Sequence, residues 1–432
     1  MAVKNIVIST YGSLGDLYPY LAIGRVLAKR GHRVTVAGGE ALQSKVESMG
    51  LAFAPLRPNL DLSDRATMKS AMTLRTGSET LARKLIFPYI RENYQDLMQT
   101  VQSADLLINH AYCFAGPIVS EKTGIPWVSC NLSPNNFWSP YDSPVIPMYP
   151  WMVHLPSLGL VPNQVFMKAV REVTHYWCKP IYQFRKEIGL PTHKHPLMEG
   201  QYSPYRVLAL FSKLLAQQQI DWPEQICITG FPFLQEGQEL PSEVEDFLQQ
   251  GDPPIVVALG SSVVLNAEAV YRCCREVITV MGKRAVFVGA QQTLSDQKKA
   301  HFAQDKHILL APYLPYASLF HRSVLVIHHG GIGTTMEALR AGRPMLIVPH
   351  SFDQPDNALR VRKLGAGVFI YSTHFTKSRL KKALHLLLRE PSYAASAQLA
   401  ARVIREENGA ETASKQIEIL VQQLESEKLL CH

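Results

Sequence analysis

The sequence predicts an α/β fold built from two doubly wound parallel sheets. Short β-branched runs alternate with helical patterns along most of the 432 residues, which favours strand–helix–strand units with parallel pairing. The runs of the carboxyl half are almost wholly apolar, as expected of strands that are covered on both faces. The chain is also too long for one ordinary core and suits two domains of about 200 residues each.

The amino half shows the alternation first. Its predicted strands are 5–10 (NIVIST), 33–39 (RVTVAGG), 105–110 (DLLINH) and 126–131 (PWVSCN). Helical patterns fall over 18–32 and around 116–123. The alternation fails between Pro134 and Pro162, where seven prolines are interspersed with aromatic residues. This composition predicts a long loop or lid, followed by amphipathic helices over 163–188.

The carboxyl half resumes the pattern after a switch near residues 205–230. Its predicted strands are 254–260, 284–289, 307–311, 324–328 and 344–349. A last helix over 412–428 follows a charged joint. We therefore expect an amino-terminal domain over 1–215, a carboxyl-terminal domain over 216–408, and a final segment over 409–432 that packs back toward the first domain.

Charge and cysteine content narrow the class of protein. The net charge of +8 is modest, and no dense Lys/Arg run appears, which disfavours nucleic-acid binding and leaves room for loose attraction to an anionic membrane surface. The seven cysteines are scattered, which favours free thiols in a reducing compartment. No apolar segment reaches the ~20 residues of a membrane span. We expect a cytoplasmic protein that is at most peripheral to a membrane.

The stretch VIHHGGIGTTMEALRAG, residues 326–342, places glycines between a strand and a helix. A helix N-terminus carries unsatisfied N–H groups and about half a positive charge, and glycine lets an anion approach that backbone closely. His329 could donate a hydrogen bond to the same anion. The turn suits a phosphate or diphosphate, although glycine also serves tight turns for steric reasons alone.

Other small and polar residues follow the neighbouring predicted strands. They are Ser261 and Ser262, Tyr313, His329, and the run from His350 to Gln354. In open α/β sheets ligands bind outside the carboxyl ends of the strands, so we expect these loops to surround one crevice with partners for phosphate, base and sugar. We also place Glu337 on the first helical turn, where it either caps the helix by its charge or accepts hydrogen bonds from a ribose.

These residues carry a resemblance to a known family. HHGGIGTTMEALRAGRPMLIVPHSFDQPDNA resembles the donor-binding motif of the family 1 glycosyltransferases, which use UDP-sugars and have the GT-B fold. YGSLGDLYPYLAIGRVLAKRGHRVTV is similar to the amino end of bacterial and sterol-acting members, and the pattern is closest to the rhamnolipid rhamnosyltransferase-like branch. The resemblance implies two Rossmann-like domains that face a cleft, the first binding the acceptor and the second the nucleotide-sugar donor.

The resemblance also implies roles for single residues. The diphosphate would lie against Ser261, Ser262, His329, Gly331, Ile332, Gly333 and Thr334. Glu337 would hold the ribose, and Asp353 and Gln354 the transferred sugar. Plant members stack a tryptophan on the base, and Tyr313 is the nearest aromatic residue here, so the base could be uracil or thymine and the donor a UDP- or dTDP-sugar.

Asp16 occupies the place of the family's catalytic base. An acceptor hydroxyl must lose a proton as it attacks the anomeric carbon, and the resemblance implies an inverting displacement with Asp16 as base. By position alone, Asp16 is better explained as the N-cap of the helix that follows it than as a catalytic base. The sequence contains no Asp-x-Asp pair, so we expect no metal or other cofactor, with the helix N-terminus and His329 stabilising the leaving diphosphate.

The acceptor side is inferred from the amino domain. Ser13, His110, Phe137 and Trp138 are the candidates there, and the aromatic, proline-rich stretch suggests an apolar pocket with a mobile cover. We expect a lipophilic hydroxylated acceptor: a lipid, sterol, terpenoid, carotenoid or polyketide. A UDP-sugar 2-epimerase of the same fold, a dinucleotide oxidoreductase (which the absence of G-x-G-x-x-G disfavours) and a non-catalytic nucleotide-sugar-binding subunit are the alternatives.

Overall fold

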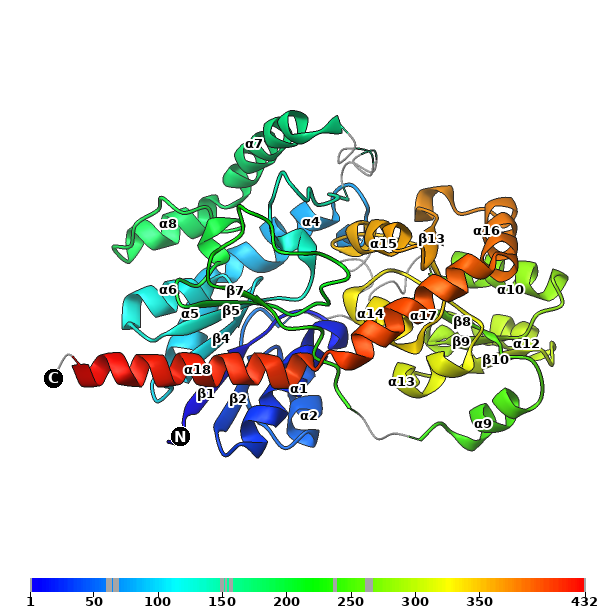
Figure 1. Ribbon diagram of the computed structural model, residues 1–432, viewed down its shortest axis with the longest axis horizontal. Helices are drawn as coiled ribbons and strands as arrows, with labels where there is room; N and C mark the ends of the chain where they lie inside the picture. The colour runs from blue at the N-terminus through cyan, green and yellow to red at the C-terminus, as the bar shows by residue number, and fades with distance from the viewer. Residues whose placement is uncertain are drawn as a thin grey trace.

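The computed structural model contains two α/β domains that lie side by side (Figure 1). It describes residues 2–59, 64, 70–147, 151, 154, 158–235, 239–260 and 267–430. Each domain is built around one parallel sheet, which confirms the predicted fold class of two doubly wound units.

The first sheet has seven strands, all parallel. In spatial order they are β3 (Ala52–Pro55), β2 (Arg33–Gly38), β1 (Asn5–Ser9), β4 (Leu106–His110), β5 (Trp127–Asn131), β6 (Arg206–Ala209) and β7 (Ile226–Ile228). The central strands are buried along almost their whole length, as their apolar runs predict. The edge strand β7 lies after residue 215, so the sheet extends past the boundary that we expected for the amino-terminal domain.

The second sheet has six parallel strands. In spatial order they are β10 (Ile308–Ala311), β9 (Ala285–Val288), β8 (Ile255–Ala258), β11 (Leu325–His328), β12 (Met345–Ile347) and β13 (Gly367–Phe369). In both sheets the strand order reverses beside the first strand, at β1/β4 and at β8/β11. Ligands of doubly wound sheets bind at such switch points.

Helices cover the sheets. In the amino-terminal part they are α1 (Leu14–Lys29), α2 (Gln43–Ser48), α4 (Gly77–Thr80), α5 (Ile90–Thr100), α6 (Ala115–Thr123), α7 (Leu160–Trp177) and α8 (Lys179–Glu187), with a π-helical turn, η2 (Leu81–Ile86). In the carboxyl-terminal part they are α9 (Ser242–Gln249), α10 (Ala267–Val280), α11 (Ala290–Thr293), α12 (Asp296–Ala303), α13 (Tyr316–Leu319), α14 (Ile332–Ala341), α15 (Gln354–Lys363), α16 (Lys377–Arg389), α17 (Pro391–Glu406) and α18 (Gly409–Leu430).

Several helices begin earlier than the sequence predicts, α1 and α7 among them. Helix α1 starts at Leu14 rather than residue 18, because Ser13 serves as its N-cap and the Asp16 carboxylate accepts a hydrogen bond from the Ser13 N–H. Helix α7 starts at Leu160 rather than residue 163. Pro162 therefore falls in its first turn, where the missing N–H does no harm.

The last helix returns to the amino-terminal domain. Helix α17 packs on α14, whereas α18 runs along α1 (Figure 1). Arg30, the C-cap residue of α1, forms ion pairs with Glu411 and Glu418 of α18. The Lys4 Nζ lies 2.6 Å from Glu425 Oε1 of the same helix. The chain thus ties its two halves together with its final helix.

Two further observations concern the described residues only. No described helix combines the length and apolarity that a membrane crossing requires. The cysteines within the described ranges are all free thiols.

Candidate active site

A cavity of about 300 Å³ lies between the two domains and contains most of the predicted site. The predicted residues on its wall are Ser13, Asp16, His110, Tyr313, His329, Gly331, Ile332, Gly333, Thr334, Glu337, Asp353 and Gln354. Residues so far apart in the chain meet because they follow the carboxyl ends of parallel strands in the two facing sheets. Ser261 and Ser262 fall outside the described residues.

In the turn after β11, neighbouring atoms leave no room for a side chain at Gly330 or Gly331. Gly330 has a φ of +96°, and a Cβ there would lie 2.8 Å from the Ile347 side chain. Gly331 is the N-cap of α14, and a Cβ on it would lie 2.5 Å from His329 Nε2. The first glycine therefore makes the turn, and the second makes room for the histidine ring.

His329 lies between two glycines. A Cβ on Gly260, after β8, would lie 2.6 Å from His329 Cε1, so both flanking turns must be glycine for the ring to fit. Burial, assisted by the nearby His350, lowers the pKa of His329 to about 3. The imidazole is therefore neutral near pH 7 and has a single N–H to donate. Together with the α14 N-terminus, it can bind an anion without carrying a full charge itself.

Glu337 lies on the second turn of α14, because the helix begins at Ile332. Our placement of this residue on the first turn was wrong, and a capping role at the helix start does not account for it. Its carboxylate accepts a hydrogen bond from Arg340 at 2.6 Å while lining the cavity. Burial raises the pKa of the Glu337 carboxyl, against the opposing effect of Arg340. The carboxylate is positioned by Arg340 and can accept hydrogen bonds from hydroxyl groups in the cleft.

The start of α15 brings a second pair of polar side chains to the cleft. The Gln354 Oε1 accepts the backbone N–H groups of His350 and Ser351 at 2.8 and 3.1 Å, which leaves its amide Nε2 as the donor. Asp353 Oδ2 accepts a hydrogen bond from Asn357 at 2.7 Å. Phe352, just before them, has a φ of +56°. A bulky residue in this region is strained, and such strain concentrates at functional sites.

Asp16 faces this pair from the amino-terminal domain. Its Oδ2 accepts hydrogen bonds from the Ser13 backbone N–H at 2.8 Å and the Ser13 hydroxyl at 3.0 Å. Burial raises the pKa of the Asp16 carboxyl, and the Ser13 hydrogen bonds oppose that shift. The pKa of Asp353 rises to about 7, first through burial and then through the negative charge of Asp16. Two carboxyl groups therefore share one cleft and influence each other's protonation.

The N-termini of two helices meet across the cleft. A Cβ on Gly333 of α14 would lie 3.7 Å from the carbonyl oxygen of Gly15 in α1. Gly12, before α1, has a φ of +109°, and a Cβ there would collide with the Asp16 carboxylate at 2.3 Å. Close packing of backbone on both sides leaves the partial positive charge of both helix starts directed into one space.

Tyr313 and His110 line the cavity from different domains. Tyr313 follows β10 and is 45% exposed, with its ring 5.8 Å from that of Tyr316. His110 ends β4 and is buried edge-on against Tyr20 and Tyr112. Burial lowers the pKa of His110 to about 3. Tyr313 offers an accessible aromatic face, whereas His110 is a neutral wall residue.

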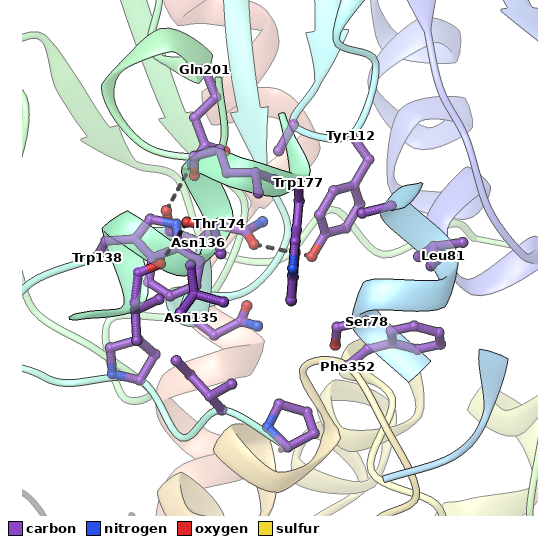
Figure 2. A pocket seen from close by; sticks show the side chains of 18 of the residues that line it. Ser78, Leu81, Tyr112, Asn135, Asn136, Trp138, Thr174, Trp177, Gln201 and Phe352 are labelled. Atoms are coloured by element: carbon purple, nitrogen blue, oxygen red, sulfur yellow. Dashed lines mark hydrogen bonds between the residues drawn. The ribbon is translucent and has the colours of Figure 1, made fainter. Parts of the chain in front are cut away.

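A second cavity, of about 210 Å³, adjoins the cleft within the amino-terminal domain. Its wall is mostly apolar and comes from α7, the π-helical turn η2 and residues 135–147. Figure 2 shows Asn135, Asn136 and Trp138 on one side and Leu81 and Phe352 on the other, with Trp177 between them. The residues that line both cavities are Leu81, Ile86, Tyr112, Asn135, Asn136 and Phe352. An apolar molecule in this cavity could thus extend a polar group into the cleft.

The two aromatic residues predicted for the acceptor side, Phe137 and Trp138, lie in different surroundings. Trp138 lines the apolar cavity. Phe137 lines neither cavity; it is 1% exposed and stacks on Trp222 at 4.4 Å and on Tyr202 at 5.7 Å. Neighbouring residues leave the 3₁₀ turn η4 (Pro134–Asn136) in different directions, so one belongs to the core and the other to the pocket.

Several wall residues escaped the sequence reasoning. Tyr112 follows β4 just after His110, and its hydroxyl donates to Asn136 Oδ1 at 3.3 Å. The search for polar residues after strand ends could have found it. Phe352 lies inside the quoted motif but carries no polar group. The apolar residues of α7 gave no signal, since a helix facing a pocket has the same periodicity as one facing a core.

Comparison with known proteins adds two family matches. Residues 6–137 match the glycosyltransferase family 28 N-terminal domain. Residues 292–419 match the erythromycin biosynthesis protein CIII-like, C-terminal domain. The first match falls within the amino-terminal domain, and the second covers part of the carboxyl-terminal domain and the start of α18. Each match includes part of the cleft wall.

Similar proteins cover nearly the whole chain. An O-mycaminosyltylonolide 6-deoxyallosyltransferase of Streptomyces fradiae is 29% identical over 96% of this chain and 97% of its own length. A sterol 3-beta-glucosyltransferase of Candida albicans is 26% identical over 96% of this chain, which spans only 27% of that longer protein. A spinosyn rhamnosyltransferase structure, complexed with thymidine diphosphate, has a TM-score of 0.67 at 18% identity and covers 96% of this chain and 100% of its own.

Proposed function

Because the chain belongs to the UDP-glycosyltransferase-like glycosyltransferases of the GT-B fold, with a family 28 amino-terminal and an EryCIII-like carboxyl-terminal domain, we propose that it transfers a hexose from a nucleoside diphosphate sugar to a hydroxyl of a lipophilic acceptor. The transfer would invert the anomeric centre. The observation that carries the proposal is the placement of Asp16 on the cleft wall together with His329 and Asp353, beside an apolar cavity.

The donor would occupy the carboxyl-terminal wall. Its diphosphate would lie at the α14 N-terminus beside His329, where helix charge and backbone N–H groups favour an anion. Glu337 would accept the ribose hydroxyls, and Asp353 with Gln354 would hold the sugar. Tyr313 would stack on the base. A relative that acts on a 6-deoxyhexose and a fold neighbour that binds thymidine diphosphate make dTDP-sugars candidates beside UDP-sugars.

The acceptor would occupy the apolar cavity with its hydroxyl directed into the cleft. A macrolide-modifying relative and sterol-modifying relatives support a polycyclic or macrocyclic acceptor. Apolar walls bind such molecules by burying their surface. The residues shared by the two cavities would form the passage through which the hydroxyl approaches Asp16.

The chemical step would be a direct displacement. The acceptor oxygen attacks the anomeric carbon as its proton passes to Asp16, and the bond from that carbon to the diphosphate oxygen breaks. The nucleoside diphosphate leaves with an added negative charge, which the α14 N-terminus and His329 stabilise. The raised pKa of Asp16 suits a base that must take a proton near neutral pH. We propose that the step uses no metal ion.

A UDP-sugar 2-epimerase would have no need of an apolar cavity open to the reaction centre. Acceptor-dependent release of nucleotide separates the two activities. The chain should be incubated with UDP- and dTDP-hexoses, each with and without a panel of sterols and macrolide aglycones, and nucleoside diphosphate and product mass measured together. Release that requires an acceptor supports transfer. Interconversion of sugar nucleotides without an acceptor would replace the proposal.

A further inference from the structure

The loop over residues 133–147, here called the acceptor loop, lines the apolar cavity and makes polar contacts with both domains. Within its own domain, the Asn136 carbonyl accepts hydrogen bonds from Gln201 and Tyr202, and the Ser139 hydroxyl donates to Asp221. Trp138, Val145 and Ile146 contribute to the apolar wall of the cavity.

Three hydrogen bonds join the loop to α15, the helix whose start carries Asp353 and Gln354. Ser133 and Val145 donate to this helix, and Asp142 accepts from it. We propose that α15 holds the acceptor loop in place and that Arg360 is the positioning residue, which couples the donor end of the cleft to the acceptor cavity. The coupling of substrates rests on the proposed function; the contacts do not.

Arg360 is the centre of the contact. It is 5% exposed, and three oxygen atoms surround its guanidinium. Its Nε donates to Asp356 Oδ2 at 2.6 Å within the same helix. Its Nη1 donates to Asp142 Oδ2 at 2.7 Å and to the Leu215 carbonyl at 2.9 Å, both outside the helix. A buried guanidinium needs such partners, and here one of its two carboxylates comes from the acceptor loop.

Two further hydrogen bonds join the acceptor loop to α15. The backbone N–H of Val145 donates to Asp356 Oδ1 at 3.0 Å. The Ser133 hydroxyl donates to Asn357 Oδ1 at 2.9 Å. Val145 also packs on Leu359 in a small apolar cluster. One helix of the other domain therefore contacts the loop at Ser133, Asp142 and Val145.

The same face of α15 continues to the donor end. Asp353, Asn357 and Arg360 are spaced by four and three residues and so share one side of the helix. Asn357 Nδ2 donates both to Asp353 Oδ2, at 2.7 Å, and to the Gly330 carbonyl of the glycine turn, at 3.0 Å. A chain of direct contacts thus runs from the anion turn through Asn357 to the acceptor loop. Movement of α15 on donor binding would be transmitted to the cavity wall.

The test uses Asp142→Ala in the full chain. Arg360 keeps Asp356 and the Leu215 carbonyl in this variant, so its charge remains paired and the fold is retained. The matched control is Glu121→Ala, which removes the carboxylate partner of another buried arginine, Arg185 (9% exposed side chain), within one domain. Asp142→Asn, which retains a neutral acceptor, should fall between Asp142→Ala and the unaltered chain.

Two measurements are made on each variant. Hydrogen exchange of peptides covering 139–147, without ligand, should be about tenfold faster in Asp142→Ala and unchanged in Glu121→Ala. Steady-state kinetics should show an acceptor KM raised about tenfold in Asp142→Ala, with the affinity for UDP or dTDP within about twofold of the unaltered chain.

The outcomes separate the claims. Unchanged exchange in Asp142→Ala overturns the structural part of the inference, whatever the activity. Faster exchange with an unchanged acceptor KM overturns the coupling. A rise in acceptor KM that is matched by an equal weakening of nucleotide affinity also overturns it, because that result indicates general destabilisation. If the unaltered chain transfers no sugar to any acceptor, the proposed function fails, whereas the exchange result still decides whether α15 holds the loop.

Discussion

The two walls of the cleft are built by different means. The carboxyl-terminal wall consists of turns at strand ends, where backbone N–H groups, His329 and the start of α15 point inward. The adjoining wall of the amino-terminal domain consists of apolar side chains from α7, η2 and the acceptor loop. In the proposed function, the first wall would bind the donor through fixed backbone geometry and the second would bind the acceptor through shape. Substitutions on the two walls should therefore change different kinetic constants.

Asp16 lines the cleft from the amino-terminal domain, and its loss should have the largest effect. Asp16→Asn keeps a hydrogen-bond acceptor for Ser13 but removes the proton acceptor. We expect kcat to fall by about 10²–10⁴-fold, with UDP or dTDP affinity within about twofold in a binding titration. Activity near that of the unaltered chain would remove Asp16 from the mechanism.

Gly331→Ala should break the carboxyl-terminal wall alone. The added Cβ would lie 2.5 Å from His329 Nε2 and displace the ring from the anion site. Loss of a hydrogen bond to a charged group predicts nucleotide affinity weaker by about 10–100-fold. The control is the His329→Ala background, in which the methyl group meets no ring. An equal loss from Gly331→Ala in that background would show that the glycine acts in some other way.

Val173→Asp should break the apolar wall alone. Val173 is 49% exposed at the rim of the apolar cavity, so a carboxylate there places charge beside the acceptor without unfolding the chain. We expect the acceptor KM to rise about tenfold and nucleotide affinity to stay constant. Val280→Asp on α10, 76% exposed and remote from both cavities, is the control. An acceptor KM equal in both variants would contradict the assignment of the cavity.

The pair of carboxyl groups predicts a pH dependence of stability. Because the pKa of Asp353 rises to about 7 from 3.8, the folded chain holds this proton more tightly than the unfolded chain. Its contribution to stability therefore falls as the pH rises from about 4 to about 7. Asp353→Asn should be more stable than the unaltered chain by about 1–3 kcal/mol at pH 8 and nearly equal at pH 4. Melting curves with the same difference at both pH values would contradict this.

Removal of divalent metal should have the smallest effect. We expect EDTA to leave the transfer rate unchanged, since the α14 N-terminus and His329 would stabilise the leaving group. The described residues contain no cluster of three or more potential metal-ligating side chains. Rates with EDTA, with and without added Mg²⁺, make the measurement. A rate that falls in EDTA and returns with Mg²⁺ would show that a metal takes part.

The difference between the two walls also explains which parts of the fold and the site could be predicted from the sequence. All the strands that we predicted are present, because strands buried on both faces read as apolar runs. The short strands β3, β6, β7 and β13 were missed. The residues of β3, β7 and β13 are only partly buried and lack such a run, whereas β6 is mostly buried but only four residues long. On the carboxyl-terminal wall, the strand ends and a short motif are enough to place His329, Asp353 and Gln354 at one sheet edge.

The apolar wall was less accessible to such reasoning. Trp138 and Phe137 were both expected on the acceptor side; Trp138 lines the apolar cavity, whereas its neighbour Phe137 is part of the core. Whether an aromatic residue faces a cavity depends on packing across the whole domain, which no local spacing encodes. The ion pair between Arg360 and Asp142 joins residues more than 200 positions apart, and nothing in the neighbourhood of either residue predicts the other.

The central claim is that strand-end turns converge on one nucleotide at the mouth of an apolar cavity. A crystal structure of the chain with UDP or dTDP tests it most directly. We predict the diphosphate at the N-terminus of α14, within hydrogen-bonding distance of His329, and the ribose beside Glu337. A nucleotide bound elsewhere, with this turn free of phosphate, would contradict the account.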